Sequence, residues 1–200
     1  MSVKKLTLIV IVFLVFFAVF AVTLMPASIA LSYGKSYLPQ GLQLGPATGT
    51  VWQGQVNGVR YQGQYLSRVK WDVHPLALLQ MTLKADVIAG NKRNSAELSA
   101  SGLVEYGMSN GAITLSGAKA RVDLETVLEQ VQLPLPTQAK GLVFVDIDSY
   151  VFGQPHCQAL SGQISSADIN VKGTNGWFSI GELEGDLACV SGSANVKVSK

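Results

Sequence analysis

Alternating apolar and polar side chains dominate the sequence beyond about residue 50. In residues 68–73, Val69, Trp71 and Val73 alternate with charged residues, which is the period-2 pattern of a strand buried on one face. The same alternation recurs, with glycine-rich or polar turns between the segments, in residues 81–87, 96–106, 111–122, 141–150, 163–172, 180–190 and 194–198. This pattern predicts a mainly β protein, a largely antiparallel curved sheet or sandwich with one or two short helices.

Two segments break the alternation and predict the short helices. Residues 75–80 begin with a proline, which suits the first position of a helical turn, and we expect this turn to place Leu76 and Leu79 under the sheet. Residues 123–132 have apolar side chains at helical spacing, with Asp123 as the candidate N-cap.

The N-terminal part of the chain has a different character. Residues 6–25 contain no charged side chain, and a helix of that length spans about 30 Å, enough to cross a bilayer. Residues 28–30 also resemble the cleavage site of a signal peptide, but the apolar run is longer than the core of about 7 to 15 residues that is usual there. The sequence therefore favours an uncleaved transmembrane helix.

Lys4 and Lys5 precede the apolar run and orient it. Positively charged flanks stay on the cytoplasmic side, so residues 1–5 are expected to be cytoplasmic. Residues 26–45, which are rich in proline and glycine, are expected to form a linker. Residues 46–200 are then an exported, periplasmic β domain.

Residues 51–65, VWQGQVNGVRYQGQY, predict a β-hairpin with Asn57 and Gly58 in a two-residue type I′ turn. In that register each strand glycine faces an aromatic ring, Gly54 opposite Tyr61 and Gly63 opposite Trp52. The aromatic face is expected to be core rather than a ligand-binding patch. The other face is an uncharged amide surface and a candidate partner-contact site, made of Gln53, Gln55, Gln62 and Gln64.

Charge and cysteine content narrow the function classes. Of the 15 Lys and Arg, two precede the apolar run, so the rest balance the 13 Asp and Glu beyond it. Their charges are scattered singly, which argues against a nucleic-acid partner. Cys157 and Cys189 are the only cysteines, and in an oxidising compartment such as the periplasm they are expected to form a structural disulfide.

The candidate catalytic and metal-ligating residues are few. His74 follows Asp72 at i+2, but the next residue is proline, so a capping role at the strand end is favoured. His156 adjoins Cys157, but consecutive side chains on a strand point apart, which argues against a thiol dyad. Another acidic set has no calcium-binding loop around it and is expected to be a solvated face: Asp146, Asp148 and Asp168.

Nucleotide-binding motifs are missing as well. The chain has no Walker loop and no GxGxxG motif. We therefore expect no enzyme, no cofactor and no metal site, but a scaffolding or binding module.

The whole pattern resembles the family of protein N of the type II secretion system. The resemblance rests on the apolar N-terminus followed by four phrases in order: GTVWQGQV (49–56), VKWDVHPLALL (69–79), LSGQISSADINV (160–171) and GELEGDLACVSGS (181–193). It implies a single-pass protein of the bacterial inner membrane with a periplasmic β domain. In that role it would be an accessory scaffolding or assembly component that supports export of folded proteins across the outer membrane, in contact with other secretion-system proteins.

One alternative function stays open at this point. A long curved β-sheet with an apolar inner face is similar to the grooves of envelope lipid-transport proteins, so a periplasmic lipid-handling module is the second hypothesis. An open apolar furrow would favour lipid handling, whereas a sealed core with an unpaired strand edge would favour the scaffold.

Overall fold

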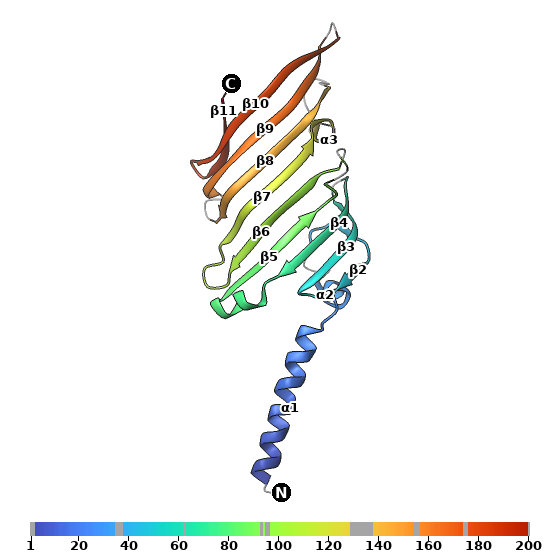
Figure 1. The fold of residues 1–200 in the computed structure, drawn as a ribbon, viewed down its shortest axis with the longest axis vertical. Coiled ribbons are helices and arrows are strands. Elements are labelled where there is room, and N and C mark those ends of the chain that lie inside the picture. The colour runs from blue at the N-terminus through green and yellow to red at the C-terminus, as the bar shows by residue number, and fades with distance from the viewer. Residues whose placement is uncertain are drawn as a thin grey trace.

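The protein forms one long antiparallel β-sheet with an N-terminal helix, as seen in a computed structural model. The structure describes residues 3–34, 38–61, 63–92, 94, 97–128, 138–153, 157–173 and 176–199, and within these it describes only the backbone of residues 3, 6, 126, 127, 198 and 199. The sheet has eleven strands, and the order β1-β3-β4-β5-β6-β7-β8-β9-β10-β11 follows the chain, with β2 also paired to β3. The mainly β, antiparallel fold predicted from the sequence is confirmed (Figure 1).

The elements have the following bounds. The helices are α1 (Val3–Thr23), α2 (Ala27–Gly34), the 3-10 helix η2 (Pro75–Gln80) and α3 (Leu124–Leu128). The strands of the first half are β1 (Gln43–Leu44), β2 (Ala47–Gly49), β3 (Gln53–Tyr61), β4 (Gln64–Val73), β5 (Thr82–Ala89) and β6 (Ser99–Gly107). Those of the second half are β7 (Ile113–Asp123), β8 (Ala139–Phe152), β9 (Cys157–Gly173), β10 (Gly176–Val190) and β11 (Ser193–Ser199).

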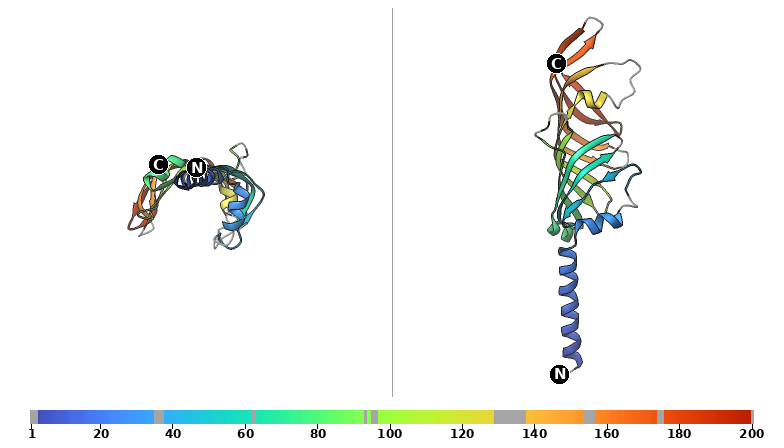
Figure 2. Two further views of the ribbon diagram at one scale, coloured as in Figure 1. Left: turned by 90° about the horizontal axis from the view of Figure 1, so that it is seen from below. Right: turned by 90° about the vertical axis from the view of Figure 1, so that its right-hand side faces the viewer.

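The sheet is bent into a trough, which Figure 2 shows end-on, with α2 and α3 inside its concave side. Strand alternation gives the sheet an apolar face and a polar face. On the apolar face, successive cross-strand partners from β4 to β9 are Val69, Ala89, Ala100, Ala120, Val145 and Ile164. The neighbouring row on the polar face is Lys70, Ile88, Ser101, Lys119, Asp146 and Gln163.

Most of the apolar face is only half-buried, because within the described part of the chain a single sheet stands without a second layer. The buried apolar residues are Ala27, Val56, Val59, Ala139, Cys157 and Ile169. No large side chain among the described residues is completely buried. Of the two architectures predicted, the curved sheet is therefore the observed one.

The helix α1 has 21 residues, and its large apolar side chains from Leu8 to Val22 are exposed. Across the residues that the structure describes, no helix reaches the length and hydropathy required to cross a membrane. After α1, the segment expected to be a linker contains the helix α2, and Pro26 forms a β-bridge with Thr50 at the edge of the sheet.

For residues 51–65, the predicted position of the hairpin turn was wrong. Strand β3 continues through Asn57 and Gly58, and the chain reverses after Tyr61, which pairs with Gln64. Gly58 has a positive φ of +76°, which bends β3 at this point. The bend lies opposite the break between β1 and β2, where the Gly45 N–H donates to the Gly58 carbonyl at 2.8 Å. Asn-Gly therefore marks a bent strand here, not a turn.

Two local predictions about side chains have different outcomes. An aromatic ring does lie opposite Gly54, but it belongs to Trp71 on β4 rather than to Tyr61. The side chains of Leu76 and Leu79 are not under the sheet, because they are 77% and 85% exposed. The 3-10 helix turns them outward, away from the sheet.

The predicted helix at residues 123–132 and the disulfide are both found. The Asp123 carboxylate accepts from the Glu125 N–H at 3.0 Å, which is the expected N-cap, although residues 129–132 lie outside the described part. Cys157 and Cys189 form a disulfide with a Cα–Cα distance of 5.8 Å and join the start of β9 to the end of β10. The bond closes a loop across two strands that are already neighbours.

Candidate partner-binding surface

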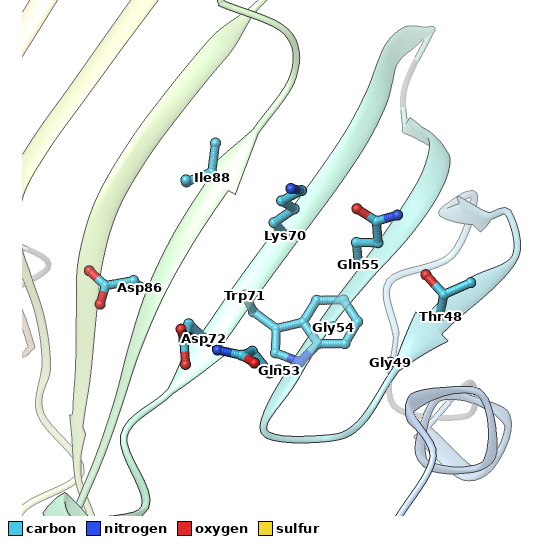
Figure 3. Close-up of a pocket in the computed structure, with 10 residues that line it drawn as sticks. All are labelled: Thr48, Gly49, Gln53, Gly54, Gln55, Lys70, Trp71, Asp72, Asp86 and Ile88. Atoms are coloured by element: carbon cyan, nitrogen blue, oxygen red, sulfur yellow. Dashed lines mark hydrogen bonds between the residues drawn. The ribbon is translucent and has the colours of Figure 1, made fainter.

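A cavity of about 540 Å³, lined in part by polar and charged side chains, lies over strands β2 to β5 (Figure 3). Two cross-strand rows build it: Gln53, Asp72 and Asp86 form one, and Gln55, Lys70 and Ile88 form the next. The complete lining is Thr48, Gly49, Gln53, Gly54, Gln55, Lys70, Trp71, Asp72, Asp86 and Ile88. The cavity follows from the polar half of the strand alternation at the N-terminal end of the sheet.

The two carboxylates in this cavity face each other. Asp72 and Asp86 are direct cross-strand partners, an arrangement that is destabilising unless each charge has a partner of its own. The Gln53 side-chain N–H donates to Asp72 Oδ2 at 2.8 Å, and His74 Nε2 lies 2.7 Å from Asp86 Oδ2. Each carboxylate is thus satisfied by a different side chain.

His74 therefore has another partner than its sequence position suggests. Its neighbour at i+2 is Asp72, but the imidazole meets Asp86 from the next strand. The two side chains are 46% and 56% exposed, so the pair is solvated. His74 also stands at the N-cap of η2, without a side-chain capping hydrogen bond.

The base of the cavity is formed by backbone that only glycine fits. A Cβ atom on Gly54 would overlap the Trp71 ring and the carbonyls of Thr48 and Thr50. The Trp71 indole N–H donates to the Val51 carbonyl at 3.1 Å, which fixes the ring in place. The close approach of β2, β3 and β4 depends on this glycine.

The predicted glutamine surface is divided by this register. Gln53 and Gln55 line the cavity, Gln64 lies at the far end of the β3–β4 pair, and Gln62 falls outside the described residues. The two lining amides stand among Lys70, Asp72 and Asp86, so the surface carries charges that the hairpin prediction did not include. Only the correct strand register could have revealed these neighbours.

The other candidate residues are not brought together. Asp146 pairs with Lys119 at 3.2 Å, while Asp148 accepts from the Ser161 hydroxyl at 3.3 Å. Among the described residues, no group of three or more His, Cys, Asp or Glu is placed to hold a metal ion. His156 lies outside the described part, and Cys157 is bonded to Cys189 and therefore has no free thiol.

A second hollow, which the sequence did not single out, lies on the apolar face. Apart from Lys119 its lining is apolar or small and comes from β5 to β8, with Val87, Gly102, Leu115 and Ile147 among the residues. Gly102 lies so close to Ala118 that a Cβ atom there would overlap it. Small side chains at neighbouring positions on adjacent strands leave the backbone as the floor of a furrow. The sequence contains these small residues, but only the strand register shows that they are neighbours.

Comparison with known proteins decides the family. The family described as "Type II secretion system (T2SS), protein N" matches residues 40–200, which include the entire sheet. The chain belongs to the protein N family of the type II secretion system. Membership makes it a component of that secretion machinery.

Two relatives in the protein N family extend the match. The chain is 32% identical over 178 residues to "Type II secretion system protein N" of Vibrio cholerae serotype O1, covering 86% of this chain and 67% of that protein. It is 26% identical over 189 residues to the protein of the same name from Aeromonas hydrophila, covering 94% of this chain and 72% of that one. No solved structure matches the chain.

Proposed function

We propose that this chain is an accessory, non-enzymatic scaffold of the type II secretion system that supports the export of folded proteins from the periplasm. The observation that carries the proposal is the family match across residues 40–200, the part of the chain that forms the trough. The described part of the trough offers binding surfaces, among them the cavity lined by Gln53, Gln55 and Lys70. A binding role in an assembly fits such surfaces.

In this proposal α1 anchors the protein in the bacterial inner membrane, with residues 1–5 in the cytoplasm and residues 46–200 in the periplasm. The uncharged run of residues 6–25 supports the anchor, and it includes Leu6, whose side chain lies outside the described set. Lys4 and Lys5 support the orientation. The Cys157–Cys189 disulfide supports an oxidising compartment for the sheet.

The surface around Gln53 and Gln55 is the proposed contact for another secretion-system protein. Its amides and the pair of opposite charges at Lys70 and Asp72 offer hydrogen-bond donors and acceptors without a large net charge. A partner segment with complementary donors and acceptors could bind there and keep these charges hydrogen-bonded. Gln64, further along the β3–β4 pair, belongs to the same proposed surface, and the sequence-based prediction adds Gln62 to it.

Site-specific photo-crosslinking in intact cells tests this contact. A photoreactive amino acid at Gln53 is expected to give an adduct with another secretion-system protein. Gln163 is the matched control, because it is an exposed glutamine on the same polar face at the other end of the sheet, on β9. Equal adducts from both positions, or none from Gln53, would exclude the proposed surface.

A lipid-handling role is the second candidate function. The comparisons lend it no support, and the observation in its favour is the apolar furrow, which lies open in the described part of the trough. A photoreactive residue at Ala118, which lines the furrow, should give a phospholipid adduct in cells if acyl chains occupy it. The same residue at Asp146, which lies on β8 between two furrow-lining residues but does not line the furrow itself, should not. Identical results at the two positions would dismiss this candidate.

A further inference from the structure

We infer that one end of the trough is a membrane-docking rim, whose apolar side chains enter the interface of the lipid bilayer. The rim consists of Ile29, Tyr33, Leu76, Leu79, Met81 and Met108. It deepens the proposed function, because it rests on the proposal that α1 lies in the membrane. The occupant of this surface is the bilayer itself rather than a protein partner.

The large apolar side chains of the rim are exposed to solvent rather than packed in a core. The exposed fractions are 77% for Leu76, 85% for Leu79 and 65% for Met81, all within or just after η2. Met108, in the turn between β6 and β7, is 48% exposed, and its N–H donates to the Met81 carbonyl at 2.9 Å. These two connections therefore form one continuous apolar projection.

The helix α2 adds a second part to the rim. Its residue Ala27 is buried, whereas Ile29 and Tyr33, spaced i and i+4 on one side of the helix, are 45% and 77% exposed. Figure 1 and the right panel of Figure 2 show α2 and η2 at the end of the sheet from which α1 departs. An anchored α1 would hold this end of the trough at the membrane surface.

Contacts with the end of α1 fix that placement. The Trp52 indole N–H donates to the Val22 carbonyl at 2.9 Å, and the Val51 N–H donates to the Met25 carbonyl at 3.0 Å. Pro26 also bridges to Thr50. The sheet begins directly at the helix end, so the rim cannot be far from the bilayer that α1 enters.

The distribution of charge separates the two ends of the trough. Residues 24–34, 75–83 and 106–118, which contain the rim, carry no charged side chain. The connection between β5 and β6, at the opposite end in Figure 1, carries Lys92 and Glu97. An uncharged, apolar end is the one that can enter the interface of a bilayer at low desolvation cost.

Fluorescence quenching in proteoliposomes tests the rim. Cys157 and Cys189 are bonded to each other and the chain has no other cysteine, so a single added cysteine can be labelled with an environment-sensitive dye. We would label Leu79→Cys, reconstitute the full chain into vesicles of phosphatidylethanolamine and phosphatidylglycerol, and add lipids with a nitroxide in the headgroup or in the acyl chain. The expected result is a blue-shifted emission and strong quenching by the headgroup nitroxide.

Two further labels make the outcomes distinct. Phe178→Cys, an exposed apolar position in the first residues of β10 at the far end of the sheet, should remain unquenched. Val15→Cys, in the middle of α1, should be quenched by the acyl-chain nitroxide if the helix is an anchor. Quenching at Val15 alone would overturn the rim and leave the anchor intact, whereas quenching at neither Val15 nor Leu79 would overturn both. Equal quenching at Leu79 and Phe178 would also overturn the rim, since the sheet would then lie along the membrane.

A second measurement asks whether the apolar side chains cause the contact. The double variant Leu76→Gln and Leu79→Gln, labelled at Met108→Cys, should lose most of the quenching seen with Met108→Cys alone. The matched control is Trp177→Gln with Phe178→Gln, which removes two exposed aromatic side chains from the other end. Unchanged quenching in the first double variant would contradict the proposal.

Discussion

The indole N–H of Trp52 donates a hydrogen bond of 2.9 Å to the backbone carbonyl of Val22, thirty residues earlier in the chain. Carbonyls in the last turn of a helix have no partner further along it, and this bond adds to the weak one, 3.5 Å long, that the Val22 carbonyl accepts from the Met25 N–H. The Val51 N–H reaches the Met25 carbonyl, and the Trp71 indole N–H reaches the Val51 carbonyl. These three bonds connect β4 through Val51 to the end of α1.

Replacing Trp52 with phenylalanine tests whether this connection holds the helix to the sheet. Trp52→Phe keeps an aromatic ring and removes the donor, so we expect a loss of about 1 kcal/mol in the free energy of unfolding. Amide exchange should become faster at Val51, whereas strands β5 to β8 should be unaffected. Hydrogen exchange followed by mass spectrometry, together with urea unfolding, measures both effects.

Trp71→Phe is the matched control for that change. It also removes one indole donor, but it leaves the Val51 carbonyl without a partner inside the sheet. Faster exchange should then spread through β3 and β4 rather than stay near Val51. If Trp52→Phe leaves the exchange at Val51 unchanged, the connection between helix and sheet does not form in solution.

Gly54 should tolerate no side chain. In Gly54→Ala the new Cβ would meet the Trp71 ring and two backbone carbonyls, so we expect overpacking to cost about 1 to 3 kcal/mol. Gly34→Ala is the comparison, because a Cβ atom there would meet no described atom within 4 Å. The midpoint of urea unfolding should fall for the first variant and stay near the original for the second, and equal midpoints would refute the close approach of β2, β3 and β4.

The sequence could predict which side chains of a strand share a face, whereas it could not predict the register in which neighbouring strands pair. Val69, Trp71 and Val73 share a face as the alternation indicated, because this pattern depends only on neighbours in the chain. The Asn57-Gly58 signal failed because a positive φ at glycine serves a kinked strand as well as a turn. Local propensity does not distinguish these two uses.

The candidate site depended on this missing register. The pairing of His74 with Asp86 and the opposition of Asp72 and Asp86 arise between strands, so no spacing along the chain could reveal them. The exposure of Leu79 was missed for a related reason. A short helical pattern shows which side chains are apolar but not whether the helix turns them toward the sheet, and here it turns them away.

The disulfide should contribute substantially to the stability of the sheet. Cys157 and Cys189 are separated by 32 residues, and closing a loop of this length stabilises by roughly 3 to 4 kcal/mol in the chain-entropy model. Urea unfolding of the double variant Cys157→Ser and Cys189→Ser should show that loss. Mass tagging of thiols without reductant should leave the original chain unlabelled, and two tags per chain would contradict the bond.

Adding a carboxylate at either of two neighbouring glutamines should have opposite effects. Gln53→Glu places a third negative charge beside Asp72 and Asp86, and it removes the side-chain N–H that donates to the Asp72 carboxylate. Gln55→Glu places the same charge opposite Lys70. Cross-strand pairs of this kind change stability by roughly 0.2 to 1 kcal/mol, so Gln53→Glu should be destabilising and Gln55→Glu neutral or stabilising.

Urea unfolding at low and high salt distinguishes this electrostatic effect from a loss of packing. Salt screens exposed charges, so the difference between the two variants should shrink as the ionic strength rises. The cavity is open to solvent, which makes such screening effective there. If both variants lose the same stability at every salt concentration, the register that places Asp72 beside Gln53 and Lys70 beside Gln55 is incorrect.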